Sequence, residues 1–397
     1  MTTEEPELEL RLLGDEDIPA TSQLMQLSFG MRPDRPLPER LRPGASYHGV
    51  FRAGRLVGAA TDLHDQQWWG GRVLEASDIA GVGVAPDARG QGIARMLIRA
   101  VLAHAHEREA VVSALFPSIS TVYRSFGWAR AGSIDVIDMP ATTLPRSRPS
   151  ETIELREATT KDLADLPGLY QRVAIARNGM ISRAEERFRG VDGELPSGID
   201  GITVALADGE LVGYCSWTRG SDTGPTAVLT VSDVLAITPA AGRALLTMLG
   251  SWQTVTGMIR LRLLHGDVIS DLLPLELGTP VHGRPWMHRP IDLVGAVAGR
   301  GWPVSAAGRA VFAIEDPLAP WNTGTWELAV EGGVGQLRPT TADTSVRLTV
   351  NGFASLYCGL STIDTVIESG HLSGPHEDAA ALGLLASSTP PHLLDSF

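Results

Sequence analysis

A glycine-containing turn between an apolar strand and an amphipathic helix is the feature that most restricts how this chain can fold. Residues 82–97 read VGVAPDARGQGIARML, so the apolar run ends at Pro86, and Gly90 and Gly92 lie just before the helix. Glycine lets the backbone approach a ligand closely, and the first amides of a helix have no hydrogen-bond partner inside it. The positive end of the helix dipole lies behind these amides. The segment therefore predicts a binding site for an anion such as a pyrophosphate.

The helix after this turn has one apolar face. Apolar residues recur at intervals of three and four from Ile93 onward, whereas Arg95 and Arg99 fall on the solvent face. Two familiar phosphate loops are excluded, because no Gly-x-x-x-x-Gly-Lys-Ser/Thr occurs and the turn reads Gly90-x-Gly92-x-x-Arg95. Taken alone, the segment also fits a plain strand-to-helix turn with no ligand.

A second motif follows downstream. Val111–Phe116 predicts another apolar strand, and Pro117-Ser118 marks the expected start of a short helix. The next residues, 123–128, read YRSFGW. Tyr123 and Phe126 are three residues apart, so their purely structural interpretation is an aromatic pair on one helix face.

Composition indicates a globular protein of two or three domains. The chain has 397 residues and 43% apolar content, which is enough for several cores. The first seven residues are acidic rather than basic, and no run of about 18 apolar residues occurs, so we expect a cytoplasmic protein without membrane insertion. The formal charge of −13 argues against a nucleic-acid partner and mildly favours a cationic one, although acidity also simply maintains solubility.

Metal and disulfide chemistry is not indicated. Cys215 and Cys358 each lie in an apolar, strand-like segment, which predicts buried reduced thiols. The ten histidines show no spacing typical of metal ligands. We therefore expect an activity that needs no metal.

The chain contains an internal duplication. Three segments of the first part recur in the second: Leu8–Arg11 as Ile153–Arg156, Gly54–Gly58 as Gly209–Gly213, and Ser77-Asp78 as Ser232-Asp233. This predicts two copies of one strand-helix-strand-strand unit. The second copy runs from Ile237-Thr238-Pro239 straight into a helical pattern without the glycine turn. We expect it to have lost the anion site.

Three domains follow from these patterns: residues 1–145, 150–285 and 286–397. The polar Pro145–Pro149 segment disfavours helix and marks the first boundary. The third region mixes alternating and helical patterns, which predicts an α+β domain. Its expected strands are 309–314, 326–330 and 345–350, and its expected helices are 291–299, 363–367 and 377–386.

These motifs resemble the GNAT N-acetyltransferases. Arg-x-x-Gly-x-Ala at 89–94 is similar to the acetyl-CoA loop of that family, and Tyr-x-x-Phe-Gly-aromatic at 123–128 is similar to its closing segment. An active GNAT unit, a degenerate GNAT unit and an α+β domain, in this order, resemble the enhanced-intracellular-survival (Eis) family over essentially the full chain. The resemblance implies a mixed α+β fold of two tandem GNAT-like units, the second degenerate, followed by a sterol-carrier-protein-like domain. Three segments match that last domain: Trp321-Asn322, Leu356–Gly359 and Pro390–Phe397.

The resemblance also implies site residues and a cosubstrate, acetyl-CoA. It assigns Tyr123 as general acid and the terminal carboxylate of Phe397 as general base; from the sequence alone, only the apolar neighbours Leu393 and Leu394 indicate that this terminus is held. The cosubstrate contacts it implies are Val82, Gly83 and Val84 for the pantetheine arm, Gly90, Gln91, Gly92, Ile93, Ala94 and Arg95 for the pyrophosphate, and Ser118 and Ile119 for a further contact.

The implied reaction is chemically sensible. A protonated amine must lose a proton before it attacks the thioester, and a partly desolvated carboxylate suits that task. A neutral tyrosine, with a pKa near 10, can then protonate a thiolate comparable to cysteine. The family resemblance implies a homohexamer that acetylates primary amines of aminoglycosides and of lysine side chains.

Alternatives to this interpretation remain open at the sequence level. Within catalysis, they are a protein-lysine acetyltransferase or another acyl-CoA N-acyltransferase. From another class, the chain could be a non-catalytic protein whose third domain binds an apolar ligand. Glu75 and Asp78, near the strand that leads into Val82, are the fallback candidates for the base.

Overall fold

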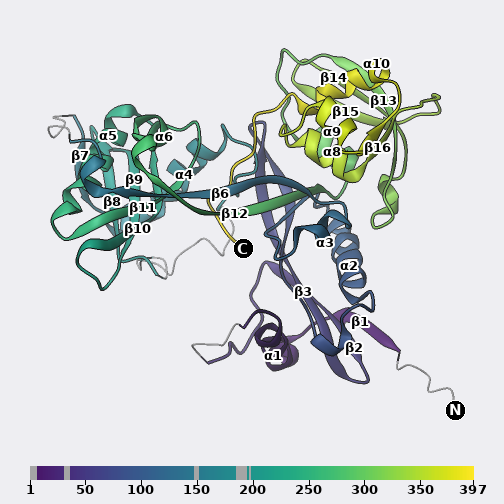
Figure 1. Cartoon of the computed structure of the whole chain (residues 1–397), viewed down its shortest axis with the longest axis horizontal. Helices are drawn as coiled ribbons and strands as arrows, with labels where there is room; N and C mark the ends of the chain where they lie inside the picture. The colour runs from purple at the N-terminus through teal and green to yellow at the C-terminus, as the bar shows by residue number, and fades with distance from the viewer. Residues whose placement is uncertain (1–6, 31–35, 147–151, 185–194, 196–197) are drawn as a thin grey trace. The chain divides into compact units, whose positions relative to one another are not determined.

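The computed structural model describes residues 7–30, 36–146, 152–184, 195 and 198–397 (Figure 1). It contains two compact units. The first combines the chain up to Ala131 with Trp286–Pro390 and Phe397, and the second combines Gly132–Pro285 with Pro391–Ser396. Most of the expected boundary segment at 145–149, and most of the acidic N-terminal segment, lie outside the described residues.

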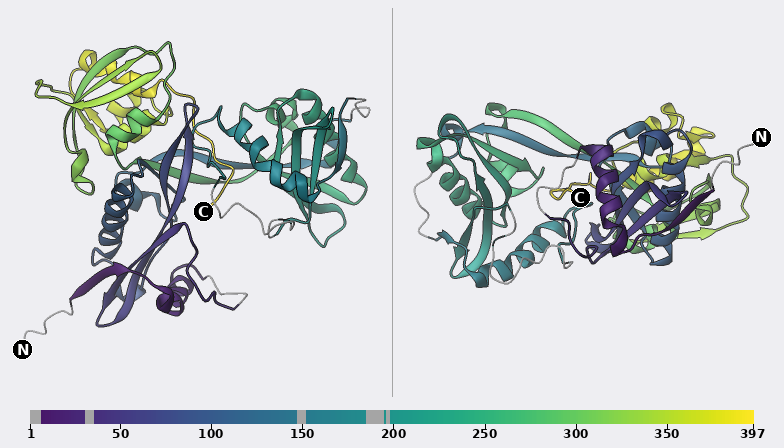
Figure 2. Two further views of the ribbon diagram at one scale, coloured as in Figure 1. Left: turned by 180° about the vertical axis from the view of Figure 1, so that it is seen from behind. Right: turned by 90° about the horizontal axis from the view of Figure 1, so that it is seen from below.

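The first unit contains a mixed sheet built around a long hairpin of β3 and β4 (Figure 2). Neighbouring strands are antiparallel except for β4 and β5, which are parallel. The strand order is β1 (Leu8–Leu12), β2 (Ala45–Arg52), β3 (Arg55–Trp69), β4 (Arg72–Val84), β5 (Val112–Leu115) and the end of β12 (Thr279–Pro290).

Helices α1 (Ile18–Phe29) and α2 (Ile93–Glu107) cover opposite faces of this sheet. Gly58 pairs with Val84, so Gly58 and Gly83 point to opposite faces. A side chain at Gly83 would meet Met25 and Ser28 of α1, whereas one at Gly58 would meet Ile93 and Leu97 of α2. The apolar face of α2 expected from the sequence is buried in the core.

The second unit has the same plan. Its strand order is β6 (Ala129–Pro140, from Gly132 onward), β11 (Thr256–Leu263), β10 (Gly224–Ala236), β9 (Glu210–Arg219), β8 (Gly201–Ala207) and β7 (Glu154–Glu157). Strands β10 and β11 are parallel, as β4 and β5 are. Its helices are α4 (Thr160–Ala174), α5 (Pro239–Gly250) and α6 (Val268–Leu272) (Figure 1).

Matching side-chain contacts confirm the internal duplication. Arg11 donates two hydrogen bonds to Asp17, at 2.7 and 2.8 Å, and Arg156 donates two to Asp162, at 2.6 and 3.0 Å. In each copy the arginine lies on the first strand, and the aspartate lies at the start of the helical segment that follows. Bidentate pairs of this kind add geometric specificity to the contact between the strand and the helical segment.

A five-stranded sheet forms the rest of the first unit. Its order is β15 (Val334–Pro339), β14 (Gly324–Glu331), β13 (Gly308–Glu315), β16 (Arg347–Thr349) and β17 (Leu372–Ser373). Helices α7 (Leu293–Gly299), α8 (Val350–Tyr357), α9 (Ile363–Glu368) and α10 (His376–Ala379) accompany it.

Two expected elements of this region differ from the prediction. The strand predicted at 345–350 is shorter, because the Thr349 side chain accepts a hydrogen bond from the Gly352 amide at 3.1 Å and so caps α8. The helix predicted at 377–386 is α10 followed by the 3-10 helix Ala380–Ala386.

Cys215 and Cys358 are both free and buried, as the sequence predicted. Cys215 lies on β9, whereas Cys358 follows the end of helix α8, so the strand predicted around it is wrong. Burial raises the pKa of each thiol. Among the described residues, no helix combines the length and the apolar character needed to cross a membrane.

Candidate active site

Strands β4 and β5 diverge at one end of the first unit's sheet. Their parallel pairing ends at Ile79 and Leu115, while β4 continues to Val84. The pairing of β4 with β3 is irregular at this point, and Gly81 has a φ of 57°. Within the described part of the chain, Gly83 and Val84 pair with β3 on one edge and with no strand on the other. An extended ligand can therefore add to this open edge.

The glycine turn lies directly after this open edge. Gly90 and Gly92 have φ values of 77° and 76°, which favour glycine. A Cβ atom at either position would have no atom within 4 Å, so the space beside both is open. No side chain caps α2, and among the described residues the amides of Gly90, Gln91 and Gly92 make no hydrogen bond. These residues fit the pyrophosphate predicted from the sequence.

Arginines from another part of the sheet flank the turn. Arg52 donates a hydrogen bond to the side chain of Gln91, and Arg55 forms an ion pair with Asp87. Arg89 Nε donates to the Val84 carbonyl at 3.3 Å. Arginines suit a phosphate-bearing ligand because their donors match its oxygens. The sequence did not single out Arg52 or Arg55, since both lie on strands far upstream of the motif.

Tyr123 lies on α3 (Ser120–Arg124), which begins two residues later than the expected Ser118. Its ring packs edge-on against the rings of Phe126 and Trp128, with centroid distances of 6.5 and 6.4 Å, so it lies partly against the core. Its hydroxyl makes no hydrogen bond to any described residue. Burial raises the pKa of Tyr123, which keeps the hydroxyl protonated near neutral pH. Ser118 and Ile119 precede the helix and are exposed.

Residues of β12 and of the five-stranded region hold the segment that carries Tyr123. Arg289 donates to the Phe126 carbonyl and forms an ion pair with Asp316 at 2.5 Å, in which both side chains are 1% exposed. Asn351 Nδ2 donates to the carbonyls of Arg124 and Trp128 at 2.9 and 3.0 Å. Sequence reasoning missed these three residues, because no local pattern links them to Tyr123.

The last residue of the chain lies at the divergence of β4 and β5. The ring centroids of Phe397 and Phe116 are 5.0 Å apart, and Phe116 directly follows β5. Leu393 and Leu394 are buried, so the C-terminal segment is held as their apolar character indicated. The contact of Phe397 with Phe116, directly after β5, is compatible with the base assigned by resemblance, and its role stays a prediction.

The two fallback carboxylates do not fit the role of base. Asp78 is fully buried, and Gln67 Nε2 donates to its Oδ1 at 3.0 Å, so a substrate amine has no access to it. Glu75 is exposed and accepts a hydrogen bond from Gln66. It precedes Val82 by seven strand residues, which is roughly 23 Å. The expectation that these groups lie near the reacting atoms is therefore not supported.

The second unit lacks the corresponding anion site, as predicted. Strand β10 ends at Ala236 and α5 begins at Pro239, which leaves no room for a glycine turn. Thr238 Oγ1 accepts a hydrogen bond from the Ala241 amide at 3.2 Å, and Pro239 has no amide hydrogen. Few free donors remain at this helix start.

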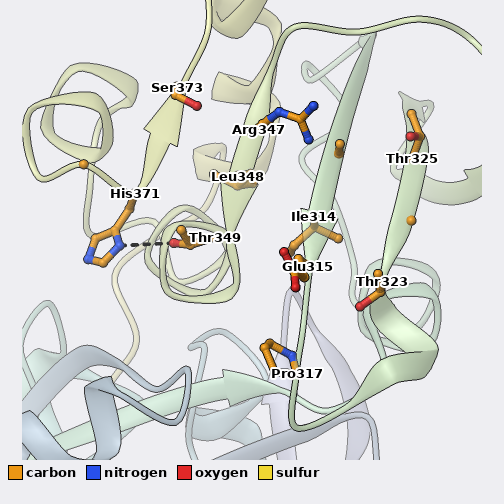
Figure 3. Close-up of a pocket in the computed structure, with 13 residues that line it drawn as sticks. Ile314, Glu315, Pro317, Thr323, Thr325, Arg347, Leu348, Thr349, His371 and Ser373 are labelled. Atoms are coloured by element: carbon orange, nitrogen blue, oxygen red, sulfur yellow. Dashed lines mark hydrogen bonds between the residues drawn. The ribbon is translucent and has the colours of Figure 1, made fainter.

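A groove of about 600 Å³ lies on the five-stranded sheet between β13, β14, β16 and β17 (Figure 3). The exposed side chains of Glu315 and Arg347 line it, and Thr349 Oγ1 lies 3.1 Å from His371 Nδ1. Beneath this sheet, Phe312 and Phe353 are fully buried with ring centroids 6.1 Å apart. A site for an apolar ligand is usually enclosed and lined by apolar side chains. Because charged side chains line this groove, it does not favour the alternative that the chain is a binding protein for an apolar ligand.

Comparison with known proteins defines the class of enzyme. Residues 9–131 and 179–289 each match an acetyltransferase (GNAT) domain model, and residues 293–394 match a sterol carrier protein domain model. The chain is therefore an acyltransferase built from tandem GNAT domains, the second degenerate, followed by a sterol-carrier-protein-like domain.

Individual relatives agree with this class. An uncharacterized N-acetyltransferase of Streptomyces avermitilis is 28% identical over 309 residues, which cover 73% of each chain. The crystal structure of a GCN5-related N-acetyltransferase from Anabaena variabilis matches with a TM-score of 0.87 at 22% identity, covering 98% of this chain and 100% of that one. Eis1 from Mycobacterium abscessus matches with a TM-score of 0.77 at 21% identity and the same coverage. Both structures are similar to this chain in fold.

Proposed function

We propose that this chain is an Eis-like, acetyl-CoA-dependent N-acetyltransferase that acts on primary amines of a cationic acceptor such as an aminoglycoside. The observation that carries the proposal is the position of Phe397. Its ring contacts Phe116 at the end of β5, where β4 presents the open edge of Val82–Val84. The terminal carboxylate, the open strand edge and the glycine turn thus belong to one unit.

This arrangement supports the following roles for the side chains. When bound, acetyl-CoA supplies the reactive thioester. The Phe397 carboxylate accepts a proton from the ammonium form of the acceptor, and the free amine nitrogen then bonds to the acetyl carbon while the carbon–sulfur bond breaks. The second proton that the nitrogen loses on forming the amide replaces the one that Tyr123 gives up. The protonated Tyr123 hydroxyl donates its proton to the leaving thiolate. A backbone amide near Val84 is the natural donor to the negative charge that develops on the carbonyl oxygen.

A panel of acceptors tests the substrate class. With acetyl-CoA and the untagged protein, we expect thiol release with an aminoglycoside to exceed that with a neutral primary amine, because the chain carries a formal charge of −13 and attracts cations. The difference should shrink at high salt. Transfer to a lysine-containing peptide alone, with none to the aminoglycoside, would contradict the proposal and favour a protein-lysine acetyltransferase.

Replacing Tyr123 by phenylalanine tests the general acid. The ring contacts to Phe126 and Trp128 remain, so packing should survive. We expect kcat to fall on the order of 10²-fold, with the Kd for acetyl-CoA unchanged. Tyr47→Phe serves as a control, because Tyr47 is another partly buried tyrosine on the same core. Turnover equal to that of the control would assign Tyr123 to packing alone.

A further inference from the structure

The helix that carries Tyr123 is too short to hold itself in place. Helix α3 has five residues, and none of them is buried. Isolated helices shorter than about 12 residues are marginal in water, so α3 needs support from the rest of the fold. The Tyr123 hydroxyl makes no hydrogen bond to any described residue. The position of this side chain is therefore set by the main chain and by the rings around it.

A tight turn follows α3 and supplies those rings. The Tyr123 carbonyl accepts hydrogen bonds from the amides of Phe126 and Trp128, both at 3.0 Å. The rings of the same two residues pack edge-on against the Tyr123 ring. A contact that fixes residues 124–128 therefore also fixes the ring of Tyr123.

Asn351 of α8 joins the two ends of this turn. Its Nδ2 donates to the Arg124 carbonyl at 2.9 Å and to the Trp128 carbonyl at 3.0 Å. A side-chain amide has two N–H donors, so both bonds can form at once. Asn351 is itself fixed, because it lies in the first turn of α8, and the Thr349 side chain caps the start of that helix. One side chain thus ties the turn after α3 to the sterol-carrier-protein-like domain.

Arg289 of β12 holds the middle of the same turn. Its Nη1 donates to the Phe126 carbonyl, and its Nη2 donates to Asp316 at 2.5 Å. Asp316 is also held, because its Oδ1 accepts hydrogen bonds from two backbone amides of the following loop, at 3.2 and 3.1 Å. Gly127 has a φ of 94°, and a Cβ atom there would collide with Arg289 Nη1. The glycine of the Tyr-x-x-Phe-Gly motif thus leaves the space that the guanidinium occupies.

We propose that Asn351 and Arg289 are positioning residues for Tyr123 in the acetyl transfer. This inference rests on the proposed role of Tyr123 as general acid. The hydroxyl must lie within hydrogen-bond reach of the leaving sulfur, so a shift of about 1 Å in the turn is costly. All three residues belong to one compact unit, so the contacts act directly on the turn. The sterol-carrier-protein-like domain, which contains Asn351, then contributes to catalysis without binding a ligand.

The variant Asn351→Ala tests the inference, because it removes both hydrogen bonds to the turn. We expect kcat to fall by about 10-fold to 100-fold, the scale of a small misplacement of a reacting group, and by no more than in Tyr123→Phe. The Kd for acetyl-CoA should stay near its wild-type value, since Asn351 is not part of the glycine turn. In an enzyme that already carries Tyr123→Phe, Asn351→Ala should cause no further loss, because the hydroxyl it positions is gone.

Two further variants guard against misfolding. Asn351→Asp keeps the size of the side chain but has no N–H donor, so we expect the same split between a lower kcat and an unchanged Kd. Thr362→Ala is a matched control in the same domain. Thr362 caps α9, where its Oγ1 accepts a hydrogen bond from the Thr365 amide at 3.2 Å. Because this bond does not involve the turn after α3, Thr362→Ala should keep wild-type kcat.

The possible results separate the positioning role from the proposed acid. A loss of kcat in Thr362→Ala equal to that in Asn351→Ala would indicate general damage and overturn the inference. Wild-type kcat in both Asn351 variants, beside an impaired Tyr123→Phe, would overturn the positioning role alone. A further loss on adding Asn351→Ala to Tyr123→Phe would also overturn it, because Asn351 would then act independently of the hydroxyl. Wild-type kcat in Tyr123→Phe would overturn the proposed acid, and this inference with it.

Discussion

Deleting Phe397 should lower kcat by about 10²-fold to 10⁴-fold, the range for loss of a general base. Deletion shifts the terminal carboxylate by one residue, roughly 3.5 Å. Adding one glycine after Phe397 should have a similar effect, because the original carboxylate becomes an amide that cannot accept a proton. The Kd for acetyl-CoA should stay near its wild-type value, since the glycine turn does not include this residue. Steady-state kinetics and calorimetric titration measure the two quantities.

The variant Phe397→Leu is the control for the aromatic contact. It loses the ring contact with Phe116 but keeps the terminal carboxylate in register. We expect a much smaller loss of kcat than for the deletion. If a protein with a C-terminal tag acetylates amines as fast as the untagged protein, the terminal carboxylate is not the base. Burial of Asp78 and the distance of Glu75 would then direct the search to other groups.

Replacing Gly92 by tryptophan should abolish acetyl-CoA binding. A Cβ atom at Gly92 would have no neighbouring atom within 4 Å, and this open space is the space the pyrophosphate needs. A tryptophan side chain would fill it. We expect calorimetric titration with acetyl-CoA to show no measurable binding, while the melting temperature falls only by the cost of a left-handed backbone at a residue with a side chain.

The variant Gly209→Trp separates the loss of acetyl-CoA binding from the cost of a left-handed backbone at a residue with a side chain. Gly209 has a φ of 83° and equally open surroundings, but it lies between β8 and β9 of the second unit. The backbone cost should be similar in both variants, whereas only Gly92→Trp should lose binding. Undiminished binding in Gly92→Trp would contradict the assignment of the glycine turn to the pyrophosphate.

Contiguous patterns of the sequence determined much of this protein. The glycine turn, the apolar face of the helix from Ile93 and the repeated segments each depend on residues close together in the chain. Turn conformation and helix periodicity are local properties, so they can be predicted without knowing the fold. The tandem units and the loss of the glycine turn from the second were predicted in this way.

The burial of Asp78 is a feature that local sequence patterns do not predict. In a strand with one face exposed, polar and apolar residues alternate, but Ser77 and Asp78 are consecutive and both fully buried. Because both faces of the sheet are covered here, a polar side chain in the strand gives no sign of exposure. The sequence could not separate a buried structural carboxylate from a catalytic one.

Only the tertiary structure decided how distant side chains support the candidate site. Arg289 of β12 and Asn351 of α8 reach the segment of Tyr123 from distant parts of the sequence. Such pairs form because packing brings their elements together, and neither partner carries a signature in its own neighbourhood. The anion site can be predicted because a turn and a helix start create it. The positions of Tyr123 and of the chain's last residue depend on contacts between distant parts of the chain.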